Sequence, residues 1–425
     1  MPQEPDHRPV VITTKASKTI LVLSQVYVPD PTSVGQHMAD AAAQMARRGY
    51  RVVALTARRG YDDPDHKYPL RELRDGVHVR RLPFSSLGKK TILLRLIGQM
   101  SFLIQCIVRG MFVRHLACVF ISTSPPMCSF AAILIARVRR VPIKYWAMDI
   151  NPDQIVALGT MSEGSLLVRL FNLLNRLILN QATDIVALDP FMADRLNRKV
   201  HISTKLHVMP PWPHEDHLEP VEHPDNPFRQ EHGLNQKFVF MYSGNISPSH
   251  PVQTILDASK HFAKDPNLVI LFIGGGLGRR SIEAFARREG LKQIRTLPYQ
   301  PLDQLRFSLS AADVHLVSMG NEMVGIVHPC KVYGALTVGR PILLLGPQRS
   351  HIGQILNDHE IGWQVDHGDV EGAVKMIQRI REVNQTKLAE MSRCAREVIL
   401  DRFSKQHLCR EFCDVLERGL GEVEH

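Results

Sequence analysis

The chain has 425 residues, more than a single hydrophobic core usually organises, so two domains are expected. Hydrophobic residues make up 44% and charged residues 22% of the sequence, which excludes general intrinsic disorder. The net charge of +10 fits nucleic acid, an anionic membrane, a phosphorylated substrate or an ordinary solvated surface, and does not decide among them.

The cysteines and the N-terminal segment favour a reducing, cytoplasmic compartment. Seven cysteines are scattered along the chain without a C-x-x-C pair, and their odd number argues against a closed disulfide framework. The first residues, MPQEPDHRPVVITTKASK, lack the apolar core of a secretory signal.

The first half of the chain alternates between strand-like and helical patterns. Strands are predicted at 17–28, 50–57, 76–83, 118–126, 142–152, 183–190 and 205–213, and helices at 37–49, from Thr91 onward, at 130–140 and at 166–182. Such alternation is typical of a parallel sheet that helices cover on both faces.

The composition then changes, and the alternation starts again. Residues 210–235, PPWPHEDHLEPVEHPDNPFRQEHGLN, are rich in Pro, His and acidic residues, which predicts a linker. Strands are then predicted at 237–245, 268–276, 294–300, 313–319 and 340–346, and helices at 252–263, 281–291, 302–312, 331–339, 351–358 and 404–420. The predicted domains are 1–210 and 236–400, joined by the linker 211–235, with a final helix in 401–425 that packs back toward the N-terminal domain.

The segment from Thr91 to Phe120 is the most membrane-like part of the sequence. It is interrupted by Arg95, Gln99, Gln105 and Arg109, so it contains no uninterrupted apolar run of about 18 residues. Basic residues beside apolar ones suit an anionic lipid surface, so residues 91–114 are expected to contact the inner membrane face. A buried helix whose arginines reach solvent is the alternative.

Three loops at predicted strand ends contain glycine or lysine beside a helix start. In QVYVPDPTSVGQHM, Gly35 permits a close backbone approach at a helix start, where a negative group is favoured. In MYSGNISPSHP, Gly244 would let a phosphate approach the backbone and His250 could help neutralise it. Ordinary turns remain the alternative for both loops.

The third loop is GIVHPCKVYGALTVGRPILLLGP, residues 325–347, in which Lys331 opens a predicted helix. A cation in the first helical turn opposes the positive end of the helix dipole, so an anion beside it is expected. The glycine-rich FIGGGLGRR does not match G-x-G-x-x-G, and we interpret it as a tight strand exit. The sequence also contains no P-loop, H-E-x-x-H or G-x-S-x-G motif, which points away from kinases and NTPases.

These blocks together resemble the retaining glycosyltransferases of family 4, in particular the bacterial branch that builds surface and capsular polysaccharides. The likeness covers nearly the whole chain and is sharpest in NPFRQEHGL, KFVFMYSGNISPSHPVQTILDA, TLPYQPLDQLRFSLSAADVHLVSM and VGIVHPCKVYGALTVGRPILLLGP. In that branch the last block usually reads close to V-P-S-K-x-Y-G-x-x-A-A-G-R-P. The resemblance implies a GT-B fold, in which two doubly wound Rossmann-like α/β domains face a central cleft.

The resemblance also implies roles for individual residues. Lys331 would brace the leaving phosphates, and Asp149 would face the acceptor. The donor side would be formed by Gly244, Asn245, His250, Pro298, Tyr299, Gly325, Ile326, Pro329 and Cys330, and the acceptor side by Gly35, Ser124 and Pro125.

The sequence departs from the family pattern at several of these positions. Many family 4 enzymes have two glutamates eight residues apart, where this chain has Ile326 and Gly334. Cys330 replaces the usual serine of the branch, and His328 replaces an apolar residue. These departures put the donor contacts in doubt more than the family resemblance.

The expected activity is the transfer of a hexosyl or N-acetylhexosaminyl group from a nucleotide-sugar, expected to be a UDP-sugar, to a glycan or polyprenyl-linked acceptor. The resemblance implies no metal and no other cofactor, and nucleic acid is not an expected partner. Two alternatives remain open: an epimerase or hydrolase of the same fold, which would need no acceptor, and a non-catalytic basic binding protein, which nucleotide-sugars would not stabilise.

Overall fold

The computed structural model describes residues 18–30, 32–60, 65–85, 92–125, 127–214, 217–276 and 278–420, with the side chains of 92–96 left out. The chain divides into two units. The first unit consists of Met1–Ile121, Phe130–Lys144 and Leu416–His425, and the second of Ser122–Ser129 and Tyr145–Val415.

The first sheet has eight strands in the order β3-β4-β2-β1-β5-β6-β7-β8. Its strands are β1 (Thr19–Leu23), β2 (Arg51–Ala57), β3 (Arg71–Arg74), β4 (Val77–Leu82), β5 (Leu116–Ser122), β6 (Ile143–Ala147), β7 (Asp184–Ala187) and β8 (Leu206–Val208). The sequence did not predict β3, which pairs antiparallel with β4 at the edge of the sheet. Its residues RELR lack a buried face, and Leu73 is exposed, so no apolar pattern marks this strand.

The helices of this part of the chain are α1 (Ser33–Arg47), α2 (Ile92–Met111), α3 (Cys128–Arg139), α4 (Asp153–Ala157), α5 (Leu166–Gln181) and α6 (Pro190–Lys199). Of these, α4 and α6 were not predicted. The start of α6 nevertheless carries a recognisable signal, because the Asp189 side chain caps it and Pro190 follows at the first helical position.

The second sheet has six strands in the order β11-β10-β9-β12-β13-β14. Its strands are β9 (Phe238–Ser243), β10 (Leu268–Ile273), β11 (Ile294–Leu297), β12 (Val314–Ser318), β13 (Ile342–Leu345) and β14 (Gly362–Val365), and neighbouring strands pair parallel. Each sheet extends in both directions from its first central strand, β1 or β9. The predicted fold class, two doubly wound α/β domains, is therefore confirmed.

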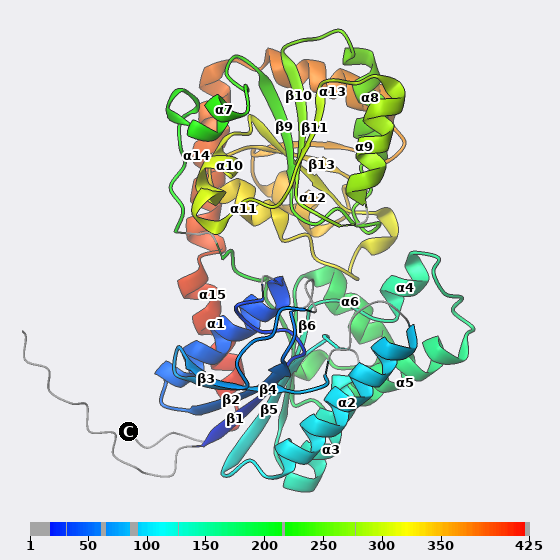
Figure 1. Cartoon of the computed structure of the whole chain (residues 1–425), viewed down its shortest axis with the longest axis vertical. Coiled ribbons are helices and arrows are strands. Elements are labelled where there is room, and N and C mark those ends of the chain that lie inside the picture. The colour runs from blue at the N-terminus through cyan, green and yellow to red at the C-terminus, as the bar shows by residue number, and fades with distance from the viewer. Residues whose placement is uncertain are drawn as a thin grey trace, which may run out of the picture. The chain divides into compact units, whose positions relative to one another are not determined.

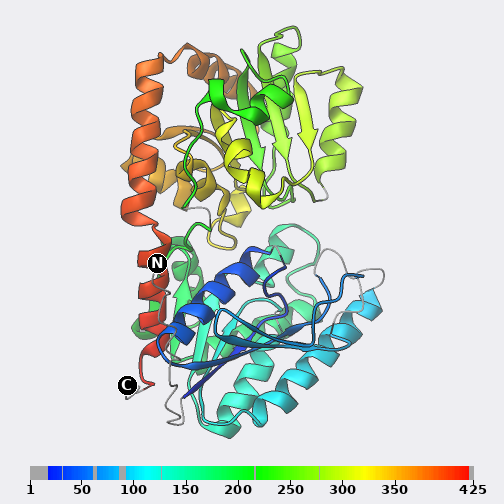
Figure 2. The ribbon, with the colours of Figure 1, turned by 60° about the vertical axis from the view of Figure 1, so that its left-hand side comes forward.

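Helices cover both faces of the second sheet. They are α7 (Pro227–Glu231), α8 (Gln253–Ser259), α9 (Gly278–Glu289), α10 (Leu305–Ser310), α11 (Lys331–Thr337), α12 (His351–Asp358), α13 (Val370–Glu382) and α14 (Gln385–Arg402). The last helix, α15 (Lys405–Glu417), packs instead on residues of the first half of the sequence. Figure 1 shows α8 and α9 to the right of this sheet and α7 and α10 to its left. The long helix α14, orange in Figure 2, packs on α11.

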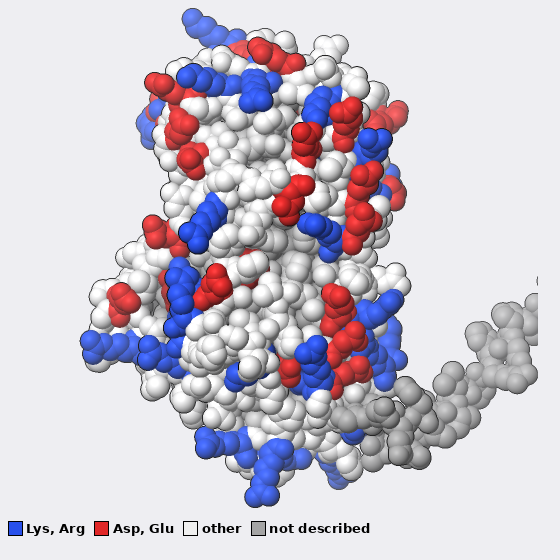
Figure 3. All heavy atoms as spheres, turned by 180° about the vertical axis from the view of Figure 1, so that it is seen from behind, with Lys and Arg blue, Asp and Glu red and all other residues white. Residues whose placement is uncertain are grey.

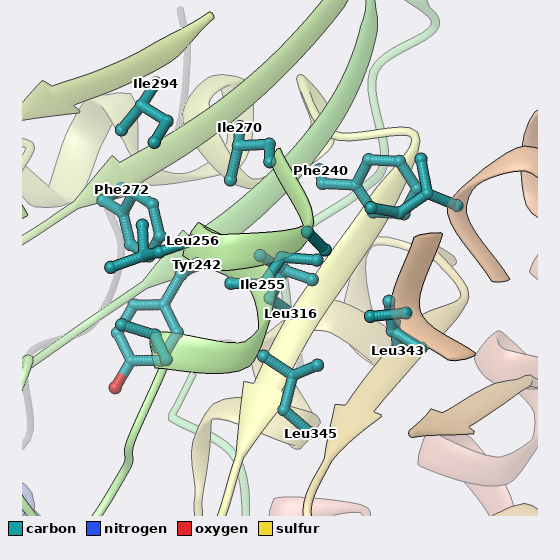
Figure 4. Packing of buried hydrophobic residues seen from close by; sticks show 14 of the residues in the cluster. Phe240, Tyr242, Ile255, Leu256, Ile270, Phe272, Ile294, Leu316, Leu343 and Leu345 are labelled. Atoms are coloured by element: carbon teal, nitrogen blue, oxygen red, sulfur yellow. The ribbon is translucent and has the colours of Figure 1, made fainter. Parts of the chain in front are cut away.

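Alternating residues of β9 belong to two different cores. Phe240 and Tyr242 pack with Ile255 of α8 and other apolar side chains in the cluster drawn in Figure 4. Their neighbours Val239 and Met241 belong to a second cluster, which includes Phe228 and the residues before β12. Because a strand with both faces buried must be apolar throughout, β9 reads as a continuous hydrophobic run in the sequence.

Residues 211–235, predicted as a linker, contain packed structure. Trp212 is buried, and its ring centroid lies 5.3 Å from that of Trp146. The guanidinium of Arg229, on α7, donates to the carbonyls of Ala311 at 2.5 Å and Leu234 at 2.8 Å. Proline-rich composition therefore marks the change between sheets without marking a loose segment.

The last helix contacts residues of the first half of the sequence within each unit. In the second unit the Phe412 ring lies 4.0 Å from the Trp146 ring, measured between centroids. In the first unit, Glu417 forms an ion pair with Arg48 at 2.5 Å, and Lys144 donates to the Arg418 carbonyl at 2.5 Å. The chain end is thereby fixed by both aromatic packing and hydrogen bonds.

Candidate functional site

The candidate site lies in the second unit, where β9 and β12 are neighbours in the second sheet. From β9 the strands β10 and β11 continue to one side, whereas β12, β13 and β14 continue to the other. In doubly wound sheets, ligands bind beyond the carboxyl ends of the strands where the order reverses in this way. The loop after β9 and the start of α11 both lie at this end.

Lys331 and Gly244 meet at this position. A Cβ atom added to Gly244 would lie 2.8 Å from Cε of Lys331, so the lysine side chain passes directly over the glycine. The Nζ atom of Lys331 lies 5.3 Å from the centroid of the Tyr242 ring, a cation–π distance. Within the described part of the chain no carboxylate forms an ion pair with Lys331. Burial lowers its pKa to about 8, so the ammonium form predominates at neutral pH.

The strand exits beside Gly244 are glycine-rich and closely packed. Gly274 has φ +140°, and a Cβ atom there would lie 2.1 Å from the carbonyl oxygen of Gly244. A Cβ atom at Gly275 would lie 2.8 Å from the Tyr299 ring, whose side chain is 58% exposed. Exposed Pro298 precedes it in the chain. The carboxyl ends of β9, β10 and β11 thus place an exposed aromatic ring near Gly244 and Lys331.

Asn245 and Tyr242 fix the turn after β9. The Tyr242 hydroxyl donates to the carbonyl oxygen of Asn245 at 2.8 Å, while Asn245 itself is exposed. A Cβ atom at Gly276 would lie 2.2 Å from Oδ1 of Asn245, so this turn also requires glycine on the neighbouring strand exit. Tyr242 was missed by sequence reasoning because a tyrosine inside a buried strand carries no signal of a site.

His250 does not supply the positive charge that the sequence suggested. Its Nδ1 hydrogen-bonds the Ser318 carbonyl oxygen at 2.8 Å, and burial together with the charge of Lys331 lowers its pKa to about 3. The imidazole is therefore neutral near pH 7, with Nδ1 as the donor and Nε2 left as an acceptor. The neutralising role is corrected to an orienting one, because His250 joins the ends of β9 and β12.

The loop before Lys331 is held by its own backbone. Gly325 has φ +69°, and a Cβ atom there would lie 2.6 Å from the Phe191 carbonyl oxygen, which only glycine tolerates. The side chain of Ile326 is buried, its N–H donates to Met323 at 2.9 Å, and its carbonyl accepts from the Ile150 N–H at 2.9 Å. Gly325 and Ile326 thus position the loop.

The amides expected to bind phosphate at the start of α11 are largely absent. Pro329 has no N–H, and the N–H of Cys330 donates to the His328 carbonyl at 3.0 Å. The helix itself is only seven residues long. The positive charge at this position therefore comes from the Lys331 side chain.

Asp149 follows β6 and lies near the same loop. Its N–H donates to the Thr123 hydroxyl at 3.1 Å, and burial raises its pKa to about 6, against the charge of His328, which lowers it. Ser124 and buried Pro125 follow Thr123, and the Pro125 carbonyl accepts from the Cys128 N–H at 2.9 Å. The structure thus brings Asp149 close to His328, a residue that the sequence marked only as a departure.

Gly35 belongs to the first unit and has a packing role there. It is buried in the first turn of α1, where a Cβ atom would lie 2.8 Å from Oγ1 of Thr32 and 3.2 Å from the Tyr27 nitrogen. The glycine lets the loop after β1 pass closely over the helix start. Among the described residues there is also no cluster of three or more His, Cys, Asp or Glu side chains that could hold a metal ion.

Comparisons with known proteins agree with the fold described above. Residues 32–212 match the family model for a glycosyl transferase 4-like domain, and residues 225–398 match that for glycosyl transferases group 1. A Pseudomonas aeruginosa protein named as a glycosyltransferase, WbjE, is 26% identical over 274 residues, 64% of this chain and 68% of its own length. Escherichia coli K12 WcaI, named as a colanic acid biosynthesis glycosyl transferase, is 22% identical over 405 residues, 92% of this chain and 98% of its own.

A solved structure shows the same fold. Anabaena Alr3699/HepE in complex with UDP-glucose superposes with a TM-score of 0.69 at 15% identity, covering 94% of this chain and 99% of that one. The fold is thus GT-B, as the sequence predicted. Because the two family models together match most of the chain, this protein belongs to the glycosyltransferases, with a glycosyl transferase 4-like domain followed by a glycosyl transferases group 1 domain.

Proposed function

We propose that this glycosyltransferase transfers a hexosyl or N-acetylhexosaminyl group from a UDP-sugar, with retention of configuration and without a metal, to a glycan or polyprenyl-linked acceptor. The observation that carries the proposal is the position of Lys331. Its aliphatic stem lies over Gly244 and its ammonium near the Tyr242 ring at the strand-order reversal, without a carboxylate partner in the described chain. Such a cation is placed to receive an anion.

The similar proteins support the donor and the pathway. The complex of HepE with UDP-glucose supports a UDP-sugar, for which the exposed Tyr299 ring offers a stacking surface for the base. The name of WcaI supports an acceptor in polysaccharide biosynthesis.

The chemistry follows from charge. When the bond between the anomeric carbon and the diphosphate oxygen breaks, its electron pair stays on the diphosphate, and Lys331 stabilises the added negative charge. Preorganised charge of this kind is usually the largest catalytic contribution. The acceptor hydroxyl then attacks from the same face and passes its proton to the departing phosphate, while Asp149 orients that hydroxyl.

Replacing Lys331 tests the proposal. Lys331→Ala should lower kcat for UDP release from a UDP-sugar, with acceptor present, by about 10²–10³-fold, as when other charge-stabilising donors are removed. Exposed Lys292 is the matched control, and Lys292→Ala should turn over normally. Near-normal turnover by Lys331→Ala would remove the lysine from the mechanism, and UDP release without any acceptor would favour the epimerase or hydrolase alternative.

We also propose that α2 and α3 of the first unit contact an anionic membrane surface, where a polyprenyl-linked acceptor would be presented. The two helices touch, since a Cβ atom at Gly110 would lie 2.5 Å from Cδ1 of Ile135. Their outer faces expose apolar side chains at helical spacing: Ile97, Met100, Ile104, Val108 and Phe112 near α2, and Phe130, Leu134 and Val138 on α3. Of the predicted segment 91–114, Thr91 and the side chains of 92–96 lie outside the described residues.

The side turned away from the viewer in Figure 1 does not carry the continuous basic stripe of a nucleic-acid footprint. On the face shown in Figure 3, Lys and Arg side chains are interspersed with Asp and Glu over most of the surface. Of the helices in the described ranges, none is both long and apolar enough to cross a bilayer, so the proposed contact is peripheral.

A further inference from the structure

A buried chain of four polar side chains runs behind the loop that carries Lys331. Oδ2 of Asp189 lies 2.9 Å from Nδ1 of His328, and Nε2 of His328 lies 2.8 Å from the Tyr333 hydroxyl. The same hydroxyl lies 3.2 Å from Nε2 of His351. All four residues are at most 9% exposed, so these bonds form away from competing water.

The hydrogen-bond directions follow from the charges. Bonds to His328 and to the Met192 N–H lower the pKa of Asp189, so it is an anionic acceptor and Nδ1 of His328 donates to it. Burial raises the pKa of Tyr333 and lowers that of His351 to about 3, so both are neutral. Tyr333 therefore links the two imidazoles with a single hydroxyl, which both donates and accepts.

These four hydrogen-bonded side chains join elements that are far apart in the sequence. Asp189 caps α6, because its Oδ1 accepts from the Met192 N–H at 2.8 Å. Tyr333 lies on α11, two residues after Lys331, and His351 begins α12. Of the four residues, only His328 lies on the loop before Lys331, so its side chain ties this loop to α6.

The backbone before His328 is anchored to neighbouring elements, whereas the backbone from His328 to Lys331 makes only local bonds. Gly325 packs against the start of α6, and Ile326 accepts the Ile150 N–H. From His328 to Lys331 the backbone bonds of the described chain are local: the Cys330 N–H donates to the His328 carbonyl, and the Pro329 and Cys330 carbonyls accept from N–H groups of α11. The side chain of His328 therefore helps to fix the position of the Lys331 backbone, where α11 starts.

We propose that His328 is a positioning residue for the donor diphosphate: by joining Asp189 to Tyr333, it holds the loop so that Lys331 lies over Gly244. The inference rests on the proposed function, because it assigns His328 to the same nucleotide-sugar site. His328 does not touch the donor, and it acts through the placement of the lysine ammonium.

Calorimetric binding of UDP and UMP tests this role, because the two ligands differ only in the β-phosphate that Lys331 would hold. His328→Phe keeps a ring but removes both hydrogen bonds. It should weaken the binding of UDP about tenfold, or about 1.4 kcal/mol, and should leave the affinity for UMP within about twofold of the wild-type value. Tyr333→Phe and His328→Asn each retain the bond to Asp189 and should give a smaller loss, about threefold, again for UDP alone.

His315 supplies the matched control. It is a buried histidine of β12 whose Nε2 lies 2.9 Å from the Leu309 carbonyl oxygen, and it is not part of the four hydrogen-bonded side chains. His315→Phe should lower the stability of the protein without changing the difference in affinity between UDP and UMP. If His328→Phe does not fold, Tyr333→Phe gives the same test.

The outcomes separate the two proposals. In one outcome, the protein binds UDP more tightly than UMP through Lys331 and keeps that difference in affinity in both His328→Phe and Tyr333→Phe. That result overturns the positioning role alone. An equal loss in His315→Phe also overturns it, because general destabilisation would then explain the effect. Wild-type protein that binds neither UDP nor the diphosphates of the other bases rejects the donor site, and the role of His328 with it.

Discussion

Gly244 shows how one backbone position can control the placement of the Lys331 side chain. Its φ of +129° lies where L-residues are strained. A Cβ atom there would lie only 2.8 Å from Cε of Lys331, so the lysine side chain would have to move. Gly244→Ala should therefore cost about 1–3 kcal/mol of stability and also weaken UDP binding, because the ammonium must move. Urea unfolding and calorimetry would measure the two effects.

Gly290 separates backbone strain from the loss of space. It also has positive φ, +69°, but a Cβ atom there would meet nothing within 4 Å. Gly290→Ala should lose stability and bind UDP normally. UDP binding by Gly244→Ala equal to that of Gly290→Ala would show that Lys331 does not need the space above Gly244.

The lowered pKa of Lys331 gives opposite pH effects on binding and on stability. Because its pKa in the folded protein is about 8, the positive charge is present below that pH and lost above it. UDP affinity should fall by up to about fivefold between pH 8 and pH 9, because the charged fraction of Lys331 falls by that factor. The unfolded chain keeps this proton to about pH 10.4, so the contribution of Lys331 to stability should rise between about 8 and 10.4.

Lys331→Arg is the control for this pH dependence. A guanidinium stays charged over the whole range, so the variant should bind UDP with an affinity that does not change between pH 8 and pH 9. A decline of the same size in Lys331→Arg would assign the pH dependence to another group.

At the scale of elements, α2 and α3 make the membrane proposal testable. Ile104 and Val108 lie on the outer face of α2 and are 55% and 52% exposed. The wild-type protein should float with vesicles that contain phosphatidylglycerol, and less with phosphatidylcholine alone, because apolar burial and basic residues act together. The double variant Ile104→Glu, Val108→Glu should remain at the bottom of the gradient.

An exposed leucine elsewhere controls for a general effect of added charge. Leu302 in the second unit is 77% exposed, and Leu302→Glu should float like the wild type. Wild-type protein that stays unbound with anionic vesicles would leave α2 and α3 as ordinary surface helices.

The sequence predicted elements well where burial is two-sided and poorly where it is partial. The strands β9, β10 and β13 were predicted because their apolar runs are continuous. By contrast β14, GWQV, is only partly buried and has no such run. The helices α13 and α14 were overlooked even though Asp369 and Asn384 cap them, a signal that sequence reasoning could have used.

The same contrast applies to the candidate site. Gly244 and Lys331 could be proposed from the sequence because strand-end glycines and a lysine at a helix start are local patterns, whereas Tyr299 was proposed only through the family resemblance. Asp189 and Tyr333 could not, since 144 positions separate them, the difference between 333 and 189, and only the folded chain brings both to His328. A residue whose role depends on distant partners leaves no spacing to recognise.

At the scale of the whole molecule, fold and chemistry are conserved to different degrees. The superposition on HepE retains a TM-score of 0.69 at 15% identity, so very different sequences build the same fold. The alternation of buried strands and covering helices tolerates such change because it needs only apolar residues at the right period. Donor choice depends instead on a few side chains, and it must be measured on this chain.

Thermal unfolding with a set of nucleotide-sugars tests the whole molecule. A donor present at 100 times its Kd should stabilise the protein by about 2.7 kcal/mol, which raises Tm by roughly 5–11 °C for a domain of about 150–250 residues. A UDP-sugar should give this shift and the other bases a smaller one. The shift and the turnover should both survive EDTA, because a lysine supplies the positive charge that a metal would otherwise provide. Loss of both with EDTA, and their return with a divalent cation, would contradict metal independence, whereas no shift with any nucleotide-sugar would favour a non-catalytic binding protein.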